Sequence, residues 1–292
     1  MHRAYCHIRA LRIRDAYAHP ATDNIERQEP TLPKVDFSLI TYSGLPDLDP
    51  DDRLLAEALR RRGFSVAAAV WDDAGVDWSR AGTCVVRSTW DYHLRHREFA
   101  SWTRRVAGAT TLINPPSTIA WNIEKTYLRD LSASGCPVIP TLWASREEAL
   151  SLACVFEETG WTDIVIKPVV GLSTHGVMRV RQGGNESDAA EHLAALAAGT
   201  GAMVQEYMES VESHGEQALI FIGGQFSHAV RKSAFQRLAP AGHAGEAPSA
   251  VAELAPELAV ARAALALLPE TPVYARVDLV RDPHGEPKLM EL

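Results

Sequence analysis

Several features that would assign the chain to a familiar class are missing from its sequence. Only four cysteines occur in 292 residues, and none forms a C-x-x-C pair or has a histidine at zinc-ligand spacing. We therefore expect reduced structural thiols and no disulfide framework. No apolar run approaches the length of about 18 residues that a membrane span requires, so no membrane partner is expected.

An excess of positive charge is missing as well. The chain carries 29 Lys+Arg against 37 Asp+Glu, which gives a formal net charge of −8. This balance argues against a nucleic-acid partner, because such a binder needs many contacts to phosphates. With 46% hydrophobic and 23% charged residues, the composition predicts a cytoplasmic globular protein of one large or two ordinary domains.

The beginning of the sequence has no secretory pattern. Four arginines stand among the first twenty residues, and no apolar h-region accompanies them. We predict that residues 1–33 form a poorly ordered extension.

Common enzyme motifs are incomplete. Gly171-Leu-Ser-Thr-His-Gly176 has the glycine spacing of a Walker A loop, but Val177 and Met178 stand where that motif needs Lys and Ser/Thr. The same segment misses G-x-S-x-G, because His175 replaces the second glycine. No G-x-G-x-x-G follows the first predicted strand, and H-E-x-x-H is absent. A P-loop, a nucleophile elbow and a dinucleotide site are therefore not supported.

From residue 33 to about residue 113, strand-length apolar runs alternate with apolar residues at helical spacing. Strands are expected at residues 35–41, 64–70, 83–88 and 111–113, and helices at 51–62 and 98–106. This βαβ rhythm predicts a mostly parallel sheet covered by helices. Asn114-Pro115-Pro116 interrupts the rhythm and marks the first domain boundary.

The second part of the chain is predicted to mix helices with antiparallel strands. Helices are expected at 122–134, 146–159, 188–198 and 251–268, and strands at 163–167, 177–182, 202–208, 218–222, 225–230, 273–280 and 287–292. Gly223-Gly224, between two of these strands, is a strong signal for a hairpin with a primed two-residue turn. The chain is therefore predicted to change from an α/β block to an α+β block.

A loop rich in glycine and hydroxyl groups follows the strand that ends at Lys167. Its backbone N–H groups and the hydroxyls of Ser173 and Thr174 could wrap phosphate oxygens, because Gly171 and Gly176 allow a close approach. Lys167 would then be a point charge for the phosphates of a nucleotide. An ordinary turn beside a solvated lysine explains the same residues.

Two carboxylates near the end of the sequence are expected to converge. Period-2 alternation places Arg276 and Asp278 on one face of their strand, and Glu291 lies on the next strand. If these strands pair, Asp278 and Glu291 offer the hard oxygen ligands that Mg²⁺ prefers. Solvent-facing acids countered by Arg276 and Lys288 are the alternative.

Two further segments have more than one interpretation. Gln205-Glu-Tyr-Met208 ends an apolar strand, where its groups could pair with an adenine edge or simply mark the polar end of the strand. Lys125 lies in the helix predicted at 122–134 and points away from its apolar face, as a solvent-exposed lysine would.

Taken in order, seven segments resemble the motifs of the ATP-grasp superfamily of carboxylate–amine ligases, in the branch like prokaryotic glutathione synthetase. They are Asn122-Ile-Glu-Lys125, Val165-Ile-Lys-Pro168, Gly171-Leu-Ser-Thr-His-Gly176, Gln205-Glu-Tyr-Met208, His214-Gly-Glu216, Ala275-Arg-Val-Asp278 and Met290-Glu291. The N-terminal part is similar to a narrower bacterial subgroup that contains D-cycloserine synthetase. That similarity lies in Leu48-Asp-Pro-Asp-Asp52, Trp71-Asp-Asp73 and Arg87-Ser-Thr-Trp-Asp-Tyr-His93.

The resemblance implies an α/β N-terminal domain of the Rossmann-like, pre-ATP-grasp type, followed by an α+β ATP-grasp fold of two subdomains. We place the N-terminal, substrate-side domain at residues 34–121. The small subdomain with the glycine loop follows at 122–204, and the larger subdomain with the metal site at 205–292. The family pattern supplies another metal ligand two residues after Glu291, so the larger subdomain is predicted to be truncated at its C-terminus.

The resemblance also assigns roles to individual residues. The ATP phosphates would be held by Lys125, Lys167, Gly171, Ser173, Thr174 and Gly176. The adenine pocket would be lined by Gln205, Glu206 and Tyr207, and Glu216 would lie near the ribose. Mg²⁺ would bind Asp278 and Glu291, while Arg276 and Lys167 would act on the transferring phosphoryl group. The candidates for recognising the substrate acid are Arg87, Ser88 and Asp91.

The function that the resemblance implies is an ATP- and Mg²⁺-dependent, ADP-forming ligase that makes a C–N bond on the carboxylate of a small amino acid or peptide. Ring closure of an O-ureido-serine-like molecule is one form of this reaction. The alternatives are a nucleotide-binding regulator with the same fold but no turnover, and an α/β module without a nucleotide. The pattern leaves a homo-oligomer open.

Overall fold

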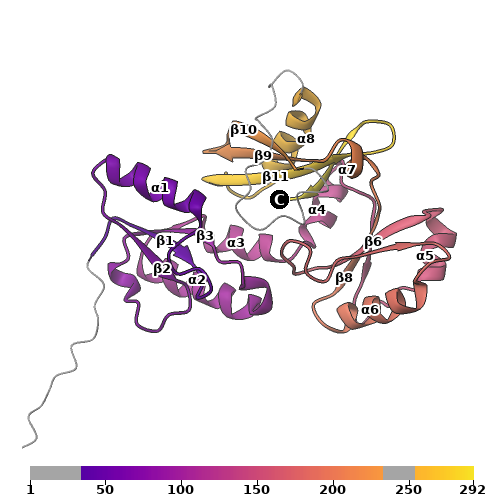
Figure 1. Ribbon diagram of the computed structural model, residues 1–292, viewed down its shortest axis with the longest axis horizontal. Helices are drawn as coiled ribbons and strands as arrows, with labels where there is room; N and C mark the ends of the chain where they lie inside the picture. The colour runs from indigo at the N-terminus through magenta and orange to yellow at the C-terminus, as the bar shows by residue number, and fades with distance from the viewer. Residues whose placement is uncertain (1–33, 233–253) are drawn as a thin grey trace, which may run out of the picture.

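The computed structural model describes residues 34–232 and 254–292, so the predicted extension at 1–33 lies outside the described residues. Its strands form three four-stranded sheets, each built from strands that are consecutive along the chain (Figure 1). The first sheet is parallel and the other two are antiparallel. The predicted change from an α/β block to an α+β block is thereby confirmed.

The N-terminal sheet has the strand order β2-β1-β3-β4. Its elements are β1 (Phe37–Thr41), α1 (Pro50–Arg61), β2 (Val66–Val70), the short helix η1 (Trp78–Arg80), β3 (Thr83–Ser88), η2 (Tyr92–Leu94), α2 (His96–Ala109) and β4 (Leu112–Ile113). The carboxyl end of a parallel strand is where ligands of such sheets usually bind. In the segment that follows β3, Tyr92 donates its hydroxyl to the carbonyl oxygen of Gly171 at 3.4 Å, so this end of the sheet contacts the rest of the molecule.

The prediction of one continuous helix at 122–134 is wrong, because these residues belong to two helices with a break between them. Helix α3 (Pro116–Ile123) ends at Glu124, which has an extended conformation, and α4 (Tyr127–Ala133) begins three residues later. The backbone N–H of Lys125, inside the break, donates to the carbonyl oxygen of Val169 at 3.0 Å. Lys125 is therefore buried between two segments and is not the solvent-exposed helical lysine that its spacing suggested.

The second sheet has the order β5-β8-β6-β7 and carries the glycine-rich loop. Its elements are β5 (Thr141–Ala144), α5 (Leu152–Thr159), β6 (Asp163–Pro168), β7 (Met178–Arg181), α6 (Glu186–Ala198) and β8 (Ala202–Glu206). Strand β5 was not predicted, and α5 starts later than the helix expected at 146–159. The late start of α5 is explained by a turn at Ser145, whose hydroxyl accepts from the backbone N–H groups of Glu147 and Glu148 at 3.2 and 3.1 Å.

The third sheet has the order β10-β9-β11-β12. Its elements are α7 (Ser210–Ser213), β9 (Glu216–Ile222), β10 (Gln225–Lys232), α8 (Ala255–Ala266), β11 (Tyr274–Arg281) and β12 (Pro287–Glu291). The predicted hairpin is confirmed, because Gly223 and Gly224 join β9 to β10 with φ values of 55° and 74°. The part of the predicted helix 251–268 before residue 254 lies outside the described residues.

Two β-bulges set the register of this sheet. One lies in β10 between Phe226 and His228, and it brings Lys232 opposite Glu216. The other lies in β12 beside Asp278, which pairs with Glu291, while Leu279 pairs with Leu289. A bulge places one extra residue on one strand and re-aims the side chains around it. Both bulges therefore decide which charged side chains meet at this end of the sheet.

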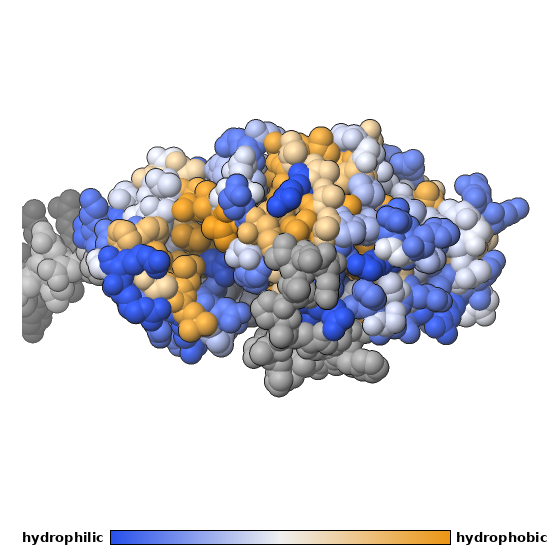
Figure 2. Space-filling model, turned by 90° about the horizontal axis from the view of Figure 1, so that it is seen from above, coloured by the Kyte–Doolittle hydropathy of each residue, from blue (hydrophilic) through white to orange (hydrophobic). Residues whose placement is uncertain are grey.

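One continuous apolar core joins the N-terminal sheet, α4 and the third sheet, whereas the second sheet has a core of its own under α5 and α6. Figure 2 shows apolar surface over the middle of the face seen from above and mostly hydrophilic surface over the end that carries α5 and α6. Large exposed apolar side chains around the third sheet include Ile222, Leu267 and Val273.

Within the described ranges, no helix is long and apolar enough to cross a membrane. The three domain boundaries stay predictions.

Candidate active site

A cavity of about 530 Å³ lies where the three sheets meet. This volume is within the usual range for small-molecule sites. Its lining includes four cationic side chains, which are Lys125, Lys167, Lys232 and Arg276, and three carboxylates, which are Glu216, Asp278 and Glu291. Because the cations outnumber the carboxylates, the cavity suits a ligand with negative charge.

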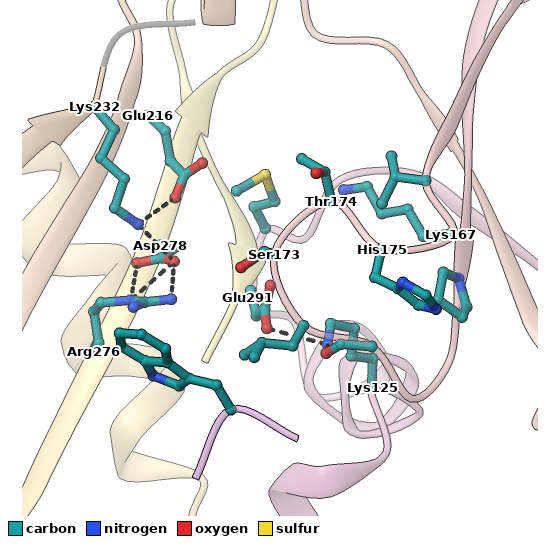
Figure 3. Close-up of a pocket in the computed structure, with 16 residues that line it drawn as sticks. Lys125, Lys167, Ser173, Thr174, His175, Glu216, Lys232, Arg276, Asp278 and Glu291 are labelled. Atoms are coloured by element: carbon teal, nitrogen blue, oxygen red, sulfur yellow. Dashed lines mark hydrogen bonds and ion pairs between the residues drawn. The ribbon is translucent and has the colours of Figure 1, made fainter. Parts of the chain in front are cut away.

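Lys125 connects the two halves of the cavity (Figure 3). Its Nζ donates to the carbonyl oxygen of Gly171 at 2.9 Å and lies 3.1 Å from Glu291 Oε1. The side chain of Lys125 is 9% exposed and that of Glu291 is 34% exposed, so water reaches this ion pair from the carboxylate side. The break between α3 and α4 is what places it there, because a continuous helix would have turned Lys125 outward.

The glycine-rich loop connects β6 to β7 and forms one wall of the cavity. Gly171, Ser173 and Thr174 line the cavity, and Lys167 lies on β6 just before the loop. Ser173 has a φ of 55°, and His192 Nε2 lies 2.8 Å from the carbonyl oxygen of Gly176. Gly176 itself does not line the cavity.

The N-terminal part holds the same loop from the other side. Tyr92 donates its hydroxyl to the carbonyl oxygen of Gly171 at 3.4 Å, and the rings of His93 and His175 lie 5.1 Å apart. Burial, followed by the nearby His175, lowers the pKa of His93 below its ordinary value. Burial likewise raises the pKa of Tyr92 to about 12, so its phenol keeps its proton at neutral pH.

Asp278 and Glu291, expected to converge, are paired across β11 and β12. Asp278 is buried and accepts from Arg276 Nε at 2.8 Å through Oδ1, while Arg276 Nη2 lies 2.8 Å from Oδ2. Burial raises the pKa of Asp278 to about 6, although Arg276 and Lys232 act in the opposite direction. The carboxyl is therefore ionised at neutral pH, and its charge in turn raises the pKa of Arg276.

Lys232 is the main site residue that the sequence analysis missed. Its Nζ lies 2.8 Å from Glu216 Oε1 and 3.4 Å from Asp278 Oδ2 (Figure 3). Glu216 is buried and lines the same cavity as Lys232 and Asp278. The strand predicted at 225–230 ended before Lys232, and a longer regular strand would have paired Glu216 with Arg231 because the bulge is not visible in the sequence.

The three residues proposed for the adenine pocket lie at the end of β8 and are absent from the lining of this cavity. Gln205 is buried and donates to Thr141 Oγ1 at 3.0 Å, while its Oε1 has no hydrogen-bond partner among the described residues. Burial raises the pKa of Glu206. The ring of Tyr207 is covered by Arg179, whose Cζ lies 3.4 Å from the ring centroid.

The three residues proposed for the substrate acid are engaged elsewhere in the N-terminal part. Arg87 Nε lies 2.6 Å from the buried Asp52, and Ser88 donates to the same carboxylate. Asp91 accepts from the indole of Trp71 at 2.9 Å. In segment 87–93, the residue that lines the cavity is Trp90.

The described residues fit a nucleotide accompanied by a divalent cation. Within residues 34–232 and 254–292, no group of three His, Cys, Asp or Glu side chains is placed to hold a metal ion by itself. Asp278 and Glu291 instead offer two carboxylates beside a cationic wall. Mg²⁺ is commonly bound by one or two carboxylates together with substrate phosphates, which matches this set of donors.

The chain is similar to known sequences, both in its N-terminal part and over most of its length. A family model described as the N-terminal domain of D-cycloserine synthetase DcsG matches residues 37–114. Over 273 residues, the chain is 36% identical to the cycloserine biosynthesis protein DcsG of Streptomyces lavendulae. That match covers 88% of this chain and 89% of the relative.

Solved structures share the fold over the same extent. The crystal structure of D-cycloserine synthetase DcsG matches with a TM-score of 0.74 and 34% identity, over 87% of this chain and 90% of that chain. A RimK domain ATP-grasp protein of Sphaerobacter thermophilus matches with a TM-score of 0.64 and 20% identity, over 87% and 89%. The ATP-grasp ligase PsnB, in complex with a minimal precursor, Mg and ADP, matches with a TM-score of 0.55 and 19% identity, over 88% of both chains. These last two likenesses concern the fold alone, and the predicted ATP-grasp fold is confirmed.

Proposed function

Because the chain belongs to the D-cycloserine synthetase (DcsG) family of ATP-grasp ligases, we propose that it uses ATP and Mg²⁺ to join a carboxylate to an amine through an acyl phosphate. The enzyme is a carboxylate–amine ligase of the cycloserine-synthetase subgroup. The observation that carries the proposal is the arrangement of Lys125, Lys167, Arg276, Asp278 and Glu291 around one cavity beside a glycine-rich loop.

A carboxylate needs activation because it is a poor electrophile. In the proposed reaction, one of its oxygens attacks the γ-phosphorus of ATP, the bond from that phosphorus to the β,γ-bridging oxygen breaks, and ADP leaves. Lys125 and Lys167 hold the phosphates, and Arg276 offsets the charge that develops on the transferring phosphoryl group. Mg²⁺ supplies further neutralisation of that charge when it is bound at Asp278 and Glu291.

The second step forms the C–N bond. The amine attacks the carbonyl carbon of the acyl phosphate, the C–O bond to phosphate breaks, and the nitrogen loses a proton. Water would hydrolyse the acyl phosphate, so the glycine-rich loop has to cover it. Tyr92 contacts the carbonyl oxygen of Gly171 and so connects this loop to the N-terminal part, where the substrate would enter, while Lys125 contacts the same oxygen from within the ATP-grasp part.

The substrate that we propose is a small amino-acid carboxylate whose amine belongs to the same molecule, as in the cyclisation that gives cycloserine. Trp90 offers an apolar side chain from the N-terminal part to the cavity that Arg276 and Asp278 also line. Arg87, Ser88 and Asp91 were predicted to recognise the substrate acid, but they do not line the cavity, and we propose instead that their contacts hold segment 87–93 in place on the substrate side.

The test is ADP formation by the purified chain with ATP, Mg²⁺ and a panel of amino acids that includes both enantiomers of O-ureido-serine. We expect ADP with at least one amino acid, loss of that signal in EDTA, and at least about a hundredfold slower turnover for D278N and K167M. D282N is the matched control, because Asp282 pairs with Lys288 at 3.3 Å and does not line the cavity. Full activity of both D278N and K167M would refute the proposed site, and nucleotide binding without ADP in any mixture would refute turnover.

A further inference from the structure

Lys232 lies between two carboxylates that belong to the proposed metal and nucleotide site. Its Nζ is 2.8 Å from Glu216 Oε1 and 3.4 Å from Asp278 Oδ2, and the three side chains form one wall of the cavity (Figure 3). Glu216 and Asp278 are 5% and 2% exposed, whereas the side chain of Lys232 is 36% exposed. The ammonium group therefore reaches inward from the rim of the cavity to two buried acids.

A buried carboxylate is costly unless a cation or hydrogen bonds compensate its charge. Arg276 contacts Asp278 at 2.8 Å, and Lys232 contacts Glu216 at the same distance. A divalent cation bound to Asp278 would place its positive charge close to the ammonium group of Lys232, which already lies 3.4 Å from this carboxylate. The two cations cannot both stay close to Asp278 without strong repulsion at such short range.

We propose that Lys232, held beside Asp278 by Glu216, is a tethered counter-cation that competes with Mg²⁺ for Asp278, so that metal enters the site together with the nucleotide and poorly without it. This inference rests on the metal role of Asp278 in the proposed function. Lys232 does not contact the reacting atoms in this proposal. It is a positioning residue, because its displacement makes the carboxylate of Asp278 available to the metal ion.

The coupling to the nucleotide follows from charge. Without phosphates, a metal ion that displaces Lys232 leaves an ammonium group in a cavity already lined by Lys125, Lys167 and Arg276. The phosphates of a nucleotide bring the negative charge that accommodates both the metal ion and the displaced ammonium. Nucleotide binding therefore raises the metal affinity, and by thermodynamic linkage the metal raises the nucleotide affinity by the same factor.

The experiment is a titration of the full chain with Mn²⁺, followed by the electron paramagnetic resonance signal of the free ion, with and without a non-hydrolysable ATP analogue. Three variants are compared with the wild type. K232Q removes the charge but keeps a hydrogen-bond donor, K232R keeps the charge, and K288Q removes a lysine that pairs with Asp282 at 3.3 Å outside the cavity.

We expect K232Q to bind Mn²⁺ alone about tenfold more tightly than the wild type, and the enhancement by the nucleotide analogue to shrink by the same factor. K232R and K288Q should behave like the wild type. A structural role of Lys232 would change unfolding but not this enhancement. If K232Q does not fold, E216Q/K232Q, which removes the acid with its partner, replaces it with the same expectation.

The inference is overturned if Mn²⁺ binds no more tightly to the charge-removing variant, or if K232R gains the same affinity. These outcomes are separate from the proposed function. ADP formation by the wild type with an unchanged Mn²⁺ affinity in K232Q would leave the ligase standing and remove the role of Lys232. Tighter Mn²⁺ binding in K232Q, with no ADP formation by the wild type, would support the role of Lys232 and refute the proposed ligase activity.

Discussion

Lys125 forms an ion pair with Glu291, with 3.1 Å between Nζ and Oε1, although the two residues come from opposite ends of the ATP-grasp part of the chain. The same ammonium group donates to the carbonyl oxygen of Gly171 at 2.9 Å. One lysine thus contacts both the glycine-rich loop and the strand that carries a proposed metal ligand. Its removal should affect the nucleotide more than the fold.

We expect K125M to weaken binding of a non-hydrolysable ATP analogue by at least about tenfold, the effect of losing one charged hydrogen bond. Calorimetric titration measures this change, and K125R, which retains the charge, should lose less affinity. Thermal unfolding of both variants serves as the check on folding. An unchanged affinity in K125M would show that Lys125 does not contact the phosphates.

Asp52 should be a strong determinant of stability in the N-terminal part. Its buried carboxylate lies 2.6 Å from Arg87 Nε and also accepts from Ser88. The side chain of Arg87 is 33% exposed, so D52A leaves a partly hydrated cation, and the loss of hydrogen bonds to a buried carboxylate should lower the free energy of unfolding in urea by about 2 kcal/mol. D51A is the control, because Asp51 is exposed in the same helical turn and its loss should cost less than about 1 kcal/mol. Equal effects of the two substitutions would contradict the pair's importance.

Gly82 cannot carry a side chain without distortion. Its φ is +61°, and a Cβ there would lie 2.2 Å from the carbonyl oxygen of Val35. Backbone strain and overlap together should cost G82A at least about 3 kcal/mol of unfolding free energy. In G108A, which has open space in helix α2, the stability should stay within about 1 kcal/mol of the wild type and move toward greater stability. Denaturant unfolding of both variants checks the contrast.

The burial of His93, beside His175, should make the stability of the fold depend on pH. Since burial lowers the pKa of His93 in the folded state, the unfolded state binds more protons at mildly acidic pH. The stability that this residue contributes is fully present above about pH 6.5 and is lost as the pH falls below that value. The melting temperature should therefore fall less between pH 7 and pH 5 in H93Q than in the wild type. H284Q, in an exposed turn, should keep the wild-type profile. An unchanged profile in H93Q would count against the role of His93.

The sequence was sufficient to locate every described strand except β5 and to place Asp278 and Glu291 on two strands that could pair, because hydrophobic runs and period-2 alternation are local signals. It was not sufficient for Lys125. The apolar spacing on both sides of Glu124 continues as in one helix, and only the hydrogen bond from Lys125 to Val169, far away in the chain, reveals the break. Local pattern carries no information about such a long-range partner.

Lys232 was missed for a different reason. A hairpin with a two-residue turn and no irregularity would pair Glu216 with Arg231. The bulge between Phe226 and His228 shifts the pairing by one residue and turns Lys232 toward Glu216. Bulges depend on packing around the strand, so counting along the sequence assigned no role to this lysine.

The bulge in β12 also has a consequence for protein engineering. In a regular strand, neighbouring side chains point to opposite faces, so one of two adjacent residues would reach the cavity. Here both Met290 and Glu291 line it. Substitutions at position 290 would therefore change an apolar part of the cavity lining directly beside Glu291, the proposed metal ligand, and leave Glu291 itself unchanged. This position is where we would begin a search for variants that accept a larger substrate.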